Sequence, residues 1–172
     1  MRPHDIVVLL KIFSLGEEEW LNKDLSNSLF ISQSEISESL NRSMFAGLIG
    51  IDKKTIQKTA LFGLMVYGLR YMFPAQAGTL AKGIPTGPSA PILRDDFPSE
   101  NSLVWPDPKM ETRGLLITPL YPKLAEAVKL DPMLYDLLAL ADTFRVGNEK
   151  EIARAKELLT NIFGQGEDYI SC

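Results

Sequence analysis

The segment from Lys23 to Ile49, with the sequence KDLSNSLFISQSEISESLNRSMFAGLI, constrains the fold of this chain more than any other. Ser32 and Glu35 match the capping box, in which a Ser and a Glu three residues later satisfy each other's backbone N–H groups, so a helix should begin directly after Ser32. Apolar side chains recur every four residues on both sides of this cap: Leu21, Leu25 and Leu29 before it, and Ile36, Leu40, Met44 and Leu48 after it. The segment therefore predicts two short helices joined by a tight turn.

The second predicted helix directs polar side chains outward, away from its apolar stripe. They are Gln33, Ser34, Ser37, Glu38, Asn41 and Arg42. Gln and Asn can pair with adenine, Arg with guanine and Glu with cytosine, while Ser donates or accepts. Two helices joined in this way are used to insert the second helix into the major groove of DNA. The alternative is an ordinary solvated face on a two-helix hairpin.

The same segment resembles the core of bacterial winged helix-turn-helix transcriptional regulators, over about residues 5–50. The matching pieces are Lys23-Asp24-Leu25, Ile31-Ser32-Gln33-Ser34, Leu40-Asn41-Arg42 and Ala46-Gly47-Leu48-Ile49. The resemblance implies that Gln33, Ser34, Ser37 and Glu38 lie nearest the bases, with Asn41 and Arg42 nearer the DNA backbone. Three residues depart from the family pattern, and the first is Ser26, which replaces a usual Ala. Phe30 stands where a Gly or small polar residue is common, and Glu38 is acidic where Arg or Lys is common.

Charge works against nucleic-acid binding, because phosphate contacts supply much of the affinity for DNA. The chain has a net charge of −4, and its first fifty residues carry four Lys or Arg against seven Asp or Glu. A DNA-binding chain with this balance must concentrate its positive charge locally, or bind as a homodimer that adds two modest footprints. Arg42, Lys53, Lys54 and Lys58 are the candidates for phosphate contacts.

The chain after Ile49 predicts an added long helix, from Lys54 to Met72, which Pro74 ends. In a winged helix a β-hairpin would stand directly after Ile49, so this helix is the main departure from the common pattern. Residues 74–98 are rich in Pro and Gly and carry apolar side chains, which favours an ordered strap packed over the surface.

A small β-hairpin is predicted after the strap, from strands at Leu103–Trp105 and Gly114–Thr118. The polar loop between them carries Lys109 and Arg113. The hairpin is either a displaced wing, whose Lys109 and Arg113 touch a phosphate or the minor groove, or a small cover over the core.

The C-terminal region predicts three helices, over residues 122–130, from Asp131-Pro132 to Gly147, and from Asn148 or Glu149 to Phe163. The last helix has an apolar stripe that packs on the same chain or pairs with a second subunit. Helix-turn-helix proteins usually bind paired half-sites, which favours the homodimer.

The whole chain is therefore expected to be mainly α. It comprises a winged helix-turn-helix core plus the long helix in residues 1–73, the strap and hairpin in 74–121, and a helical extension in 122–172. Helix 1 is predicted from Pro3 to Ser14, and helix 2 from about Glu17–Glu19.

The sequence argues against an enzyme. His4 is the only histidine and Cys172 the only cysteine, which is too few for a conventional zinc site, and we expect His4 to be solvated. Asp95-Asp96 is interpreted as a solvated turn. We expect no cofactor and no bound metal.

The setting is expected to be cytoplasmic, since a single cysteine allows no internal disulfide. No apolar run approaches the ~18 residues of a membrane span.

These observations predict a cytoplasmic, sequence-specific transcriptional regulator that binds double-stranded DNA as a homodimer. Two alternatives remain. In one, the winged helix is a protein-interaction module, which the acidic balance and Glu38 favour. In the other, the strap and the Leu64–Met72 helix enclose a pocket for a small-molecule effector.

Overall fold

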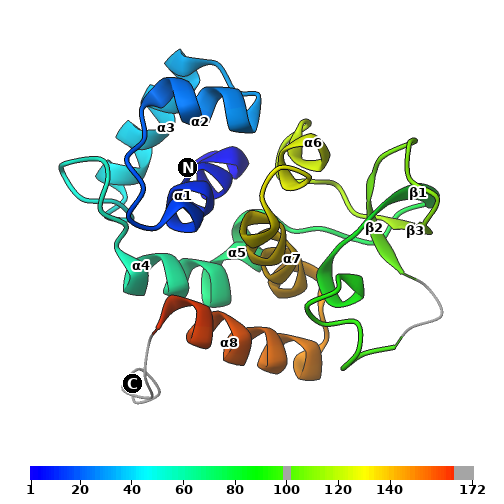
Figure 1. Cartoon of the computed structure of the whole chain (residues 1–172). Helices are drawn as coiled ribbons and strands as arrows, with labels where there is room; N and C mark the ends of the chain where they lie inside the picture. The colour runs from blue at the N-terminus through cyan, green and yellow to red at the C-terminus, as the bar shows by residue number, and fades with distance from the viewer. Residues whose placement is uncertain (99–101, 165–172) are drawn as a thin grey trace. The chain divides into compact units, whose positions relative to one another are not determined.

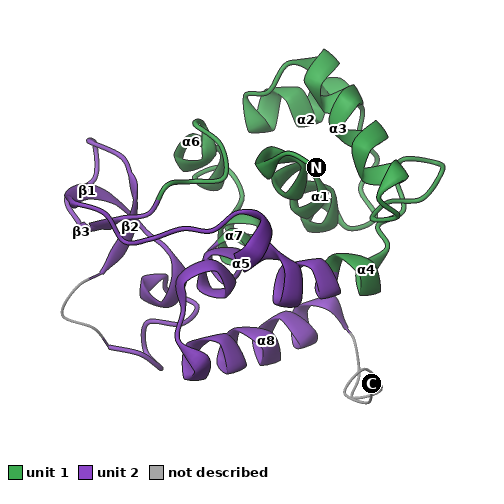
Figure 2. Cartoon of the chain, turned by 180° about the vertical axis from the view of Figure 1, so that it is seen from behind, with its two compact units in different colours: residues 1–61, 118–138 green, residues 62–117, 139–172 purple. Residues whose placement is uncertain are grey.

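The computed structural model describes residues 1–98 and 102–164, and the chain divides into two compact units (Figure 2). Unit 1 comprises residues 1–61 and 118–138, and unit 2 comprises residues 62–117 and 139–172. Both units are built mainly from helices. Within the described ranges, no helix has both the length and the apolar character needed to cross a bilayer.

Unit 1 is built around three helices that contact one another: α1 (Pro3–Leu15), α2 (Asn22–Leu29) and α3 (Gln33–Phe45) (Figure 1). The short helix α6 (Leu124–Val128) contacts α2, and the first part of α7 (Pro132–Val146) completes the unit. The predicted inward stripe is confirmed at Leu25, Leu29, Ile36 and Leu40, which are buried.

The first residue of α1 agrees with the sequence prediction, but the first residue of α2 does not. α1 begins as predicted, at Pro3, but α2 begins at Asn22, so the expected start near Glu17–Glu19 is wrong. The Leu21 N–H instead donates to the Asp24 carboxylate at 2.9 Å, and this local cap fixes the later start. Leu21 is consequently exposed rather than packed inward.

Of the two hydrogen bonds in the predicted capping box between α2 and α3, one is present. The Ser32 hydroxyl accepts from the backbone N–H of Glu35 at 3.3 Å, and α3 begins at Gln33. The reciprocal contact from the Glu35 carboxylate is not formed, because that carboxylate is bonded to Arg42 and His4. Phe30 adopts a left-handed conformation with φ of 55°, which explains why a Gly would also suit this position.

A minimal β-hairpin follows α3 directly. Ile49 pairs with Ile56 in an antiparallel bridge, and the Gly50 N–H donates to the Thr55 carbonyl at 2.8 Å. Asp52 closes the turn, because its Oδ1 accepts from the N–H groups of Lys54 and Thr55 at 3.0 Å each. The prediction of a helix from Lys54 is therefore wrong, because residues 49–56 form this hairpin.

The long helix begins four residues later than predicted. α4 (Lys58–Gly63), a π-helical turn η1 (Leu64–Gly68) and α5 (Leu69–Met72) follow one another and lead the chain from unit 1 into unit 2. Leu61, Met65 and Leu69 are buried, in agreement with the predicted helical spacing.

Unit 2 contains a small sheet of β1 (Leu80–Pro85), β2 (Leu103–Pro106) and β3 (Arg113–Leu116). β1 pairs antiparallel with both other strands, while β2 and β3 run parallel. The two strands predicted after the strap are present, but they do not form a hairpin, since β1 from the strap pairs with each. The strap is ordered, and it also holds the short helix η2 (Gly87–Ser89).

Two helices complete unit 2: the second part of α7, and α8 (Glu149–Phe163), which begins at one of its two predicted starts and is capped by Asn148. The buried Asp142 carboxylate accepts from Trp105 Nε1 and Arg145 Nη1 at 2.6 Å each and from the Thr86 hydroxyl at 2.9 Å. This network joins α7 to the sheet side of the unit. On α8, Ala155, Leu159 and Phe163 are buried within the chain.

Candidate nucleic-acid interface

The α3 helix has two polar faces that differ in what they contact. Ser34, Glu38, Asn41 and Phe45 are spaced four, three and four residues apart, so they lie along one line on the helix surface. We call this line the outer stripe. Ser34, Glu38 and Phe45 are exposed and Asn41 is half-buried, while Gln33 and Ser37 flank the stripe at its N-terminal end.

Arg42 lies on the other polar face, which is turned toward α1. Its Nε and Nη2 donate to the two Asp5 oxygens at 2.9 and 2.7 Å, and Nη2 also donates to Glu35 Oε1 at 2.6 Å. The Asp5 side chain is 0% exposed and that of Arg42 is 24% exposed. The structure therefore differs from the prediction that Arg42 points outward to DNA, because a buried carboxylate on α1 holds its guanidinium.

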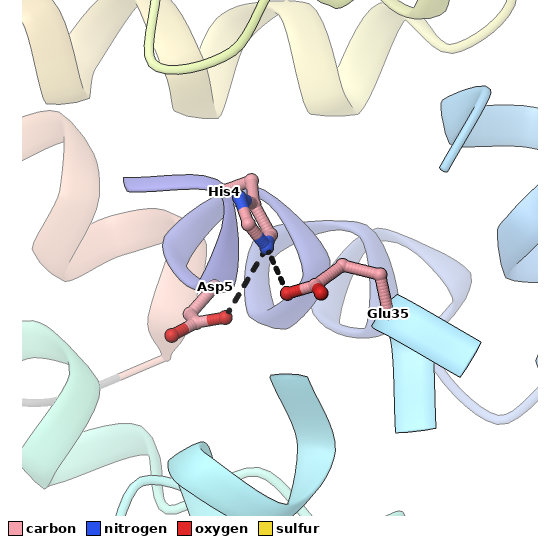
Figure 3. A group of neighbouring side chains, drawn as sticks. All are labelled: His4, Asp5 and Glu35. Carbon is pink, nitrogen blue, oxygen red and sulfur yellow. Dashed lines mark hydrogen bonds and ion pairs between the residues drawn. The ribbon is translucent and has the colours of Figure 1, made fainter. Parts of the chain in front are cut away.

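His4 belongs to the same cluster, contrary to the prediction that it is solvated. Its Nε2 lies 2.8 Å from Glu35 Oε1 and 3.7 Å from Asp5 Oδ1 (Figure 3). Among the described residues, these three side chains make up the one group with the spacing of metal ligands. Arg42 and Arg2 already neutralise both carboxylates, with Arg2 Nη1 at 3.1 Å from Glu35. A divalent ion would have to lie against two guanidinium groups, so the chemistry fits an ion-pair cluster better than a metal centre.

The pKa values of Asp5, Glu35 and Arg42 are shifted toward their charged forms. Burial alone raises the pKa of Asp5, but hydrogen bonds from Arg42 and Arg2 outweigh it and hold the pKa below the ordinary value. Hydrogen bonds from Arg42 and His4 lower the pKa of Glu35. The bond to Asp5 raises the pKa of Arg42 further. Asp5, Glu35 and Arg42 therefore stay ionised near neutral pH, and their bonds tie α3 to α1.

The hairpin brings one lysine to the outer stripe. Lys53 Nζ donates to Asn41 Oδ1 at 2.6 Å, and this bond fixes the hairpin turn beside the middle of α3. Two residues that sequence reasoning assigned separately, Asn41 and Lys53, thus belong to one surface. Lys53 retains two further N–H donors for a phosphate or a base.

Lys54 faces elsewhere in unit 1. Its ammonium lies 5.5 Å from the centre of the Trp20 ring, and the Lys58 ammonium lies 5.6 Å from that of Phe13. Both lysines line a surface groove of about 490 Å³ whose other walls include Glu17, Glu18 and Glu19. The acidic wall and the cation–π contacts compete with a phosphate for these ammonium groups.

Lys109 and Arg113 are exposed residues of unit 2, in the loop after β2 and at the start of β3. Arg113 lines a shallow depression with Leu80, Ala81 and Lys82. Both belong to unit 2, and the hairpin predicted to present them is wrong because β2 and β3 run parallel.

Sequence reasoning missed two apolar residues at this surface. Phe45 is 95% exposed and Ile51, at the start of the hairpin turn, is 92% exposed. Phe45 falls outside the four-residue spacing of the buried stripe, and its distance of four residues from Asn41 could have placed it on the polar face.

Comparison with known proteins gives no assignment of family. No protein-family model matches the chain, and the searches of curated proteins and of solved structures each found no match. The function must therefore be argued from the surface itself.

Proposed function

We propose that this chain is a sequence-specific DNA-binding regulator of transcription, and that the outer stripe of α3 enters the major groove. One observation carries the proposal. Ser34, Glu38 and Asn41 line one exposed or half-buried side of α3, while Arg42 on the inner face is bonded to Asp5 of α1. The inner face of α3 is bonded to α1, and its outer face carries polar side chains. A helix of this kind, preceded by a tight turn and another helix, has the form used for docking in the major groove.

The side chains of the surface suit base recognition. Gln33 and Asn41 can pair with adenine, Ser34 and Ser37 with several base edges, and Glu38 with the amino group of cytosine. Lys53 and the hairpin stand in the place of a wing beside the helix. Arg42 is not part of this proposed set, because it is bonded to Asp5 and Glu35.

We propose that this regulator is cytoplasmic, and its charge favours a dimeric form. Unit 1 carries nine Lys and Arg against eleven Asp and Glu, and Arg2, Asp5, Glu35 and Arg42 neutralise one another. One copy therefore offers few phosphate contacts. Two copies bound to paired half-sites together make twice as many phosphate contacts, so we propose a homodimer.

The proposal is tested by selecting binding sites from random duplexes and measuring affinity by fluorescence anisotropy. For Gln33→Ala plus Asn41→Ala we expect affinity to fall about 10- to 100-fold, since each base contact contributes ~1–3 kcal/mol. Circular dichroism and urea unfolding should show an intact fold. Asn161→Ala, an exposed position of α8 in unit 2, is the matched control and should bind like wild type. Unchanged affinity in the double variant would rule out this face.

A second candidate function is a protein-interaction module, and the exposed Phe45 and Ile51 favour it. The salt dependence of binding separates the two. DNA affinity falls linearly with salt on a logarithmic scale because counterions are released, whereas a mainly apolar protein contact is far less sensitive.

A further inference from the structure

The exposed Phe45 and Ile51 require an explanation beyond the polar stripe. Scattered apolar side chains are normal at protein surfaces, but these two are almost completely exposed and lie on neighbouring elements of unit 1. Phe45 ends α3, and Ile51 begins the turn of the hairpin.

The Lys53–Asn41 bond relates these positions to the outer stripe. Asn41 lies one helical turn before Phe45 on the same line, and Lys53 lies two residues after Ile51. The hairpin turn is thus held against the helix surface that Phe45 continues. Whatever binds the outer stripe would meet Phe45 at its C-terminal end.

We propose that Phe45 and Ile51 are apolar DNA contacts, and that Phe45 recognises the 5-methyl group of a thymine. This inference rests on the proposed DNA binding. The thymine methyl is the apolar group on the base edges of the major groove, and aromatic or small apolar side chains recognise it. Ile51, beside Lys53, packs against the sugar next to the phosphate that Lys53 contacts.

DNA fits these residues better than a protein partner does. A stable protein interface buries about 800 Å² on each partner, and an aromatic side chain supplies about 150–250 Å². Phe45 and Ile51 therefore provide only a small part of such an area, while Ser34, Glu38 and Asn41 beside them are polar. Unit 1 is acidic and offers few phosphate contacts, so it requires affinity from another source. Two apolar contacts with DNA add affinity that does not depend on phosphates.

The test replaces each thymine of a selected binding site in turn by deoxyuridine, which removes only the methyl group. We expect the full-length wild-type protein to lose about fourfold in affinity at one thymine per half-site, the equivalent of ~0.8 kcal/mol for one buried carbon. Phe45→Ser should bind the thymine site more weakly and make no distinction between thymine and uracil there. Phe45→Leu should restore part of the distinction. Ile51→Ser should weaken binding to both duplexes equally.

The controls separate failure of this inference from failure of DNA binding. Leu130→Ser removes another exposed apolar side chain of unit 1 and should leave affinity unchanged. If wild type binds DNA but is insensitive to every methyl group, the inference is wrong and the proposed function stands. If Phe45→Ser keeps full DNA affinity and changes the mass measured by light scattering, Phe45 belongs to a protein contact. If wild type binds no duplex, both proposals fail.

Discussion

The two polar faces of α3 carry similar residue types and have opposite surroundings. On the inner face, Arg42 and Glu35 form short bonds to a buried carboxylate and to His4 of α1. On the outer face, Ser34 and Glu38 are exposed, and the half-buried Asn41 accepts a bond from Lys53. The difference teaches that a charged residue on a helix of this kind can serve the fold rather than a ligand.

The largest effect is expected from breaking the inner face. Arg42→Ala leaves the Asp5 carboxylate buried without its partner, and removal of one member of such a pair costs about 3 kcal/mol or more. Urea unfolding followed by circular dichroism measures this loss. Asn41→Ala, one residue away on the outer face, removes the bond from Lys53 and should cost only about 1 kcal/mol.

The double variant Asp5→Asn plus Arg42→Ala sharpens this prediction. It removes both charges of the pair, so the buried Asp5 position no longer carries a carboxylate without its partner. We expect it to be more stable than Arg42→Ala alone. Equal stability of Arg42→Ala and wild type would show that the inner cluster does not hold the helix.

The inner face should also make stability depend on acid. The pKa values of Asp5 and Glu35 lie below their ordinary 3.8 and 4.5 in the folded protein. Carboxyls lowered in this way contribute stability that is fully present above the unfolded-state pKa and is lost as the pH falls through the folded-state pKa. Urea unfolding from about pH 5 down to about pH 2 should therefore show a falling free energy of unfolding.

Arg42→Lys provides the comparison for this acid profile. A lysine keeps the charge but cannot form the two-pronged bond to Asp5, so the pKa values should lie closer to ordinary ones. We expect its loss of stability to be smaller over the same pH range. Identical profiles would mean that other carboxyls dominate the acid response.

A smaller effect is expected at the edge of the outer face. Lys53→Ala should weaken DNA binding similarly for all sequences and reduce the slope of log affinity against log salt by about 1, the loss of one phosphate contact. Lys109→Ala, in unit 2, tests whether the loop after β2 contributes as well. If Lys109→Ala reduces the slope and Lys53→Ala does not, the hairpin at Ile49–Ile56 is not the DNA-contacting element.

The regular parts of the fold were predictable because local signals determine them. The Ser32 cap sets the start of α3, and the four-residue apolar spacing sets the buried sides of α2 and α3. The Arg42–Asp5 pair was not predictable, because its members lie 37 residues apart and no helical period relates them. The outward assignment of Arg42 failed for that reason.

The positions of strands β2 and β3 could also be predicted from local sequence, whereas their pairing could not. The strands at β2 and β3 could be recognised from their apolar residues, but their parallel relation depends on β1, which lies in a Pro- and Gly-rich strap. The Ile49–Ile56 bridge is a single pair of residues, too short for an alternating pattern. Its turn is set by Asp52, whose hydrogen bonds to Thr55 and Lys54 also lower its pKa to about 2.

The most direct measurement of the central claim is an NMR titration of the 19.2 kDa protein with a selected duplex. It observes both faces of α3 at once, through the backbone amides and the Arg42 Nε–H. The account predicts that Ser34, Glu38, Asn41 and Phe45 shift or broaden on binding while the Arg42 Nε–H signal stays unchanged. Shifts at the Arg42 guanidinium without shifts on the outer stripe would contradict it, as would a bound duplex that perturbs no residue of α3.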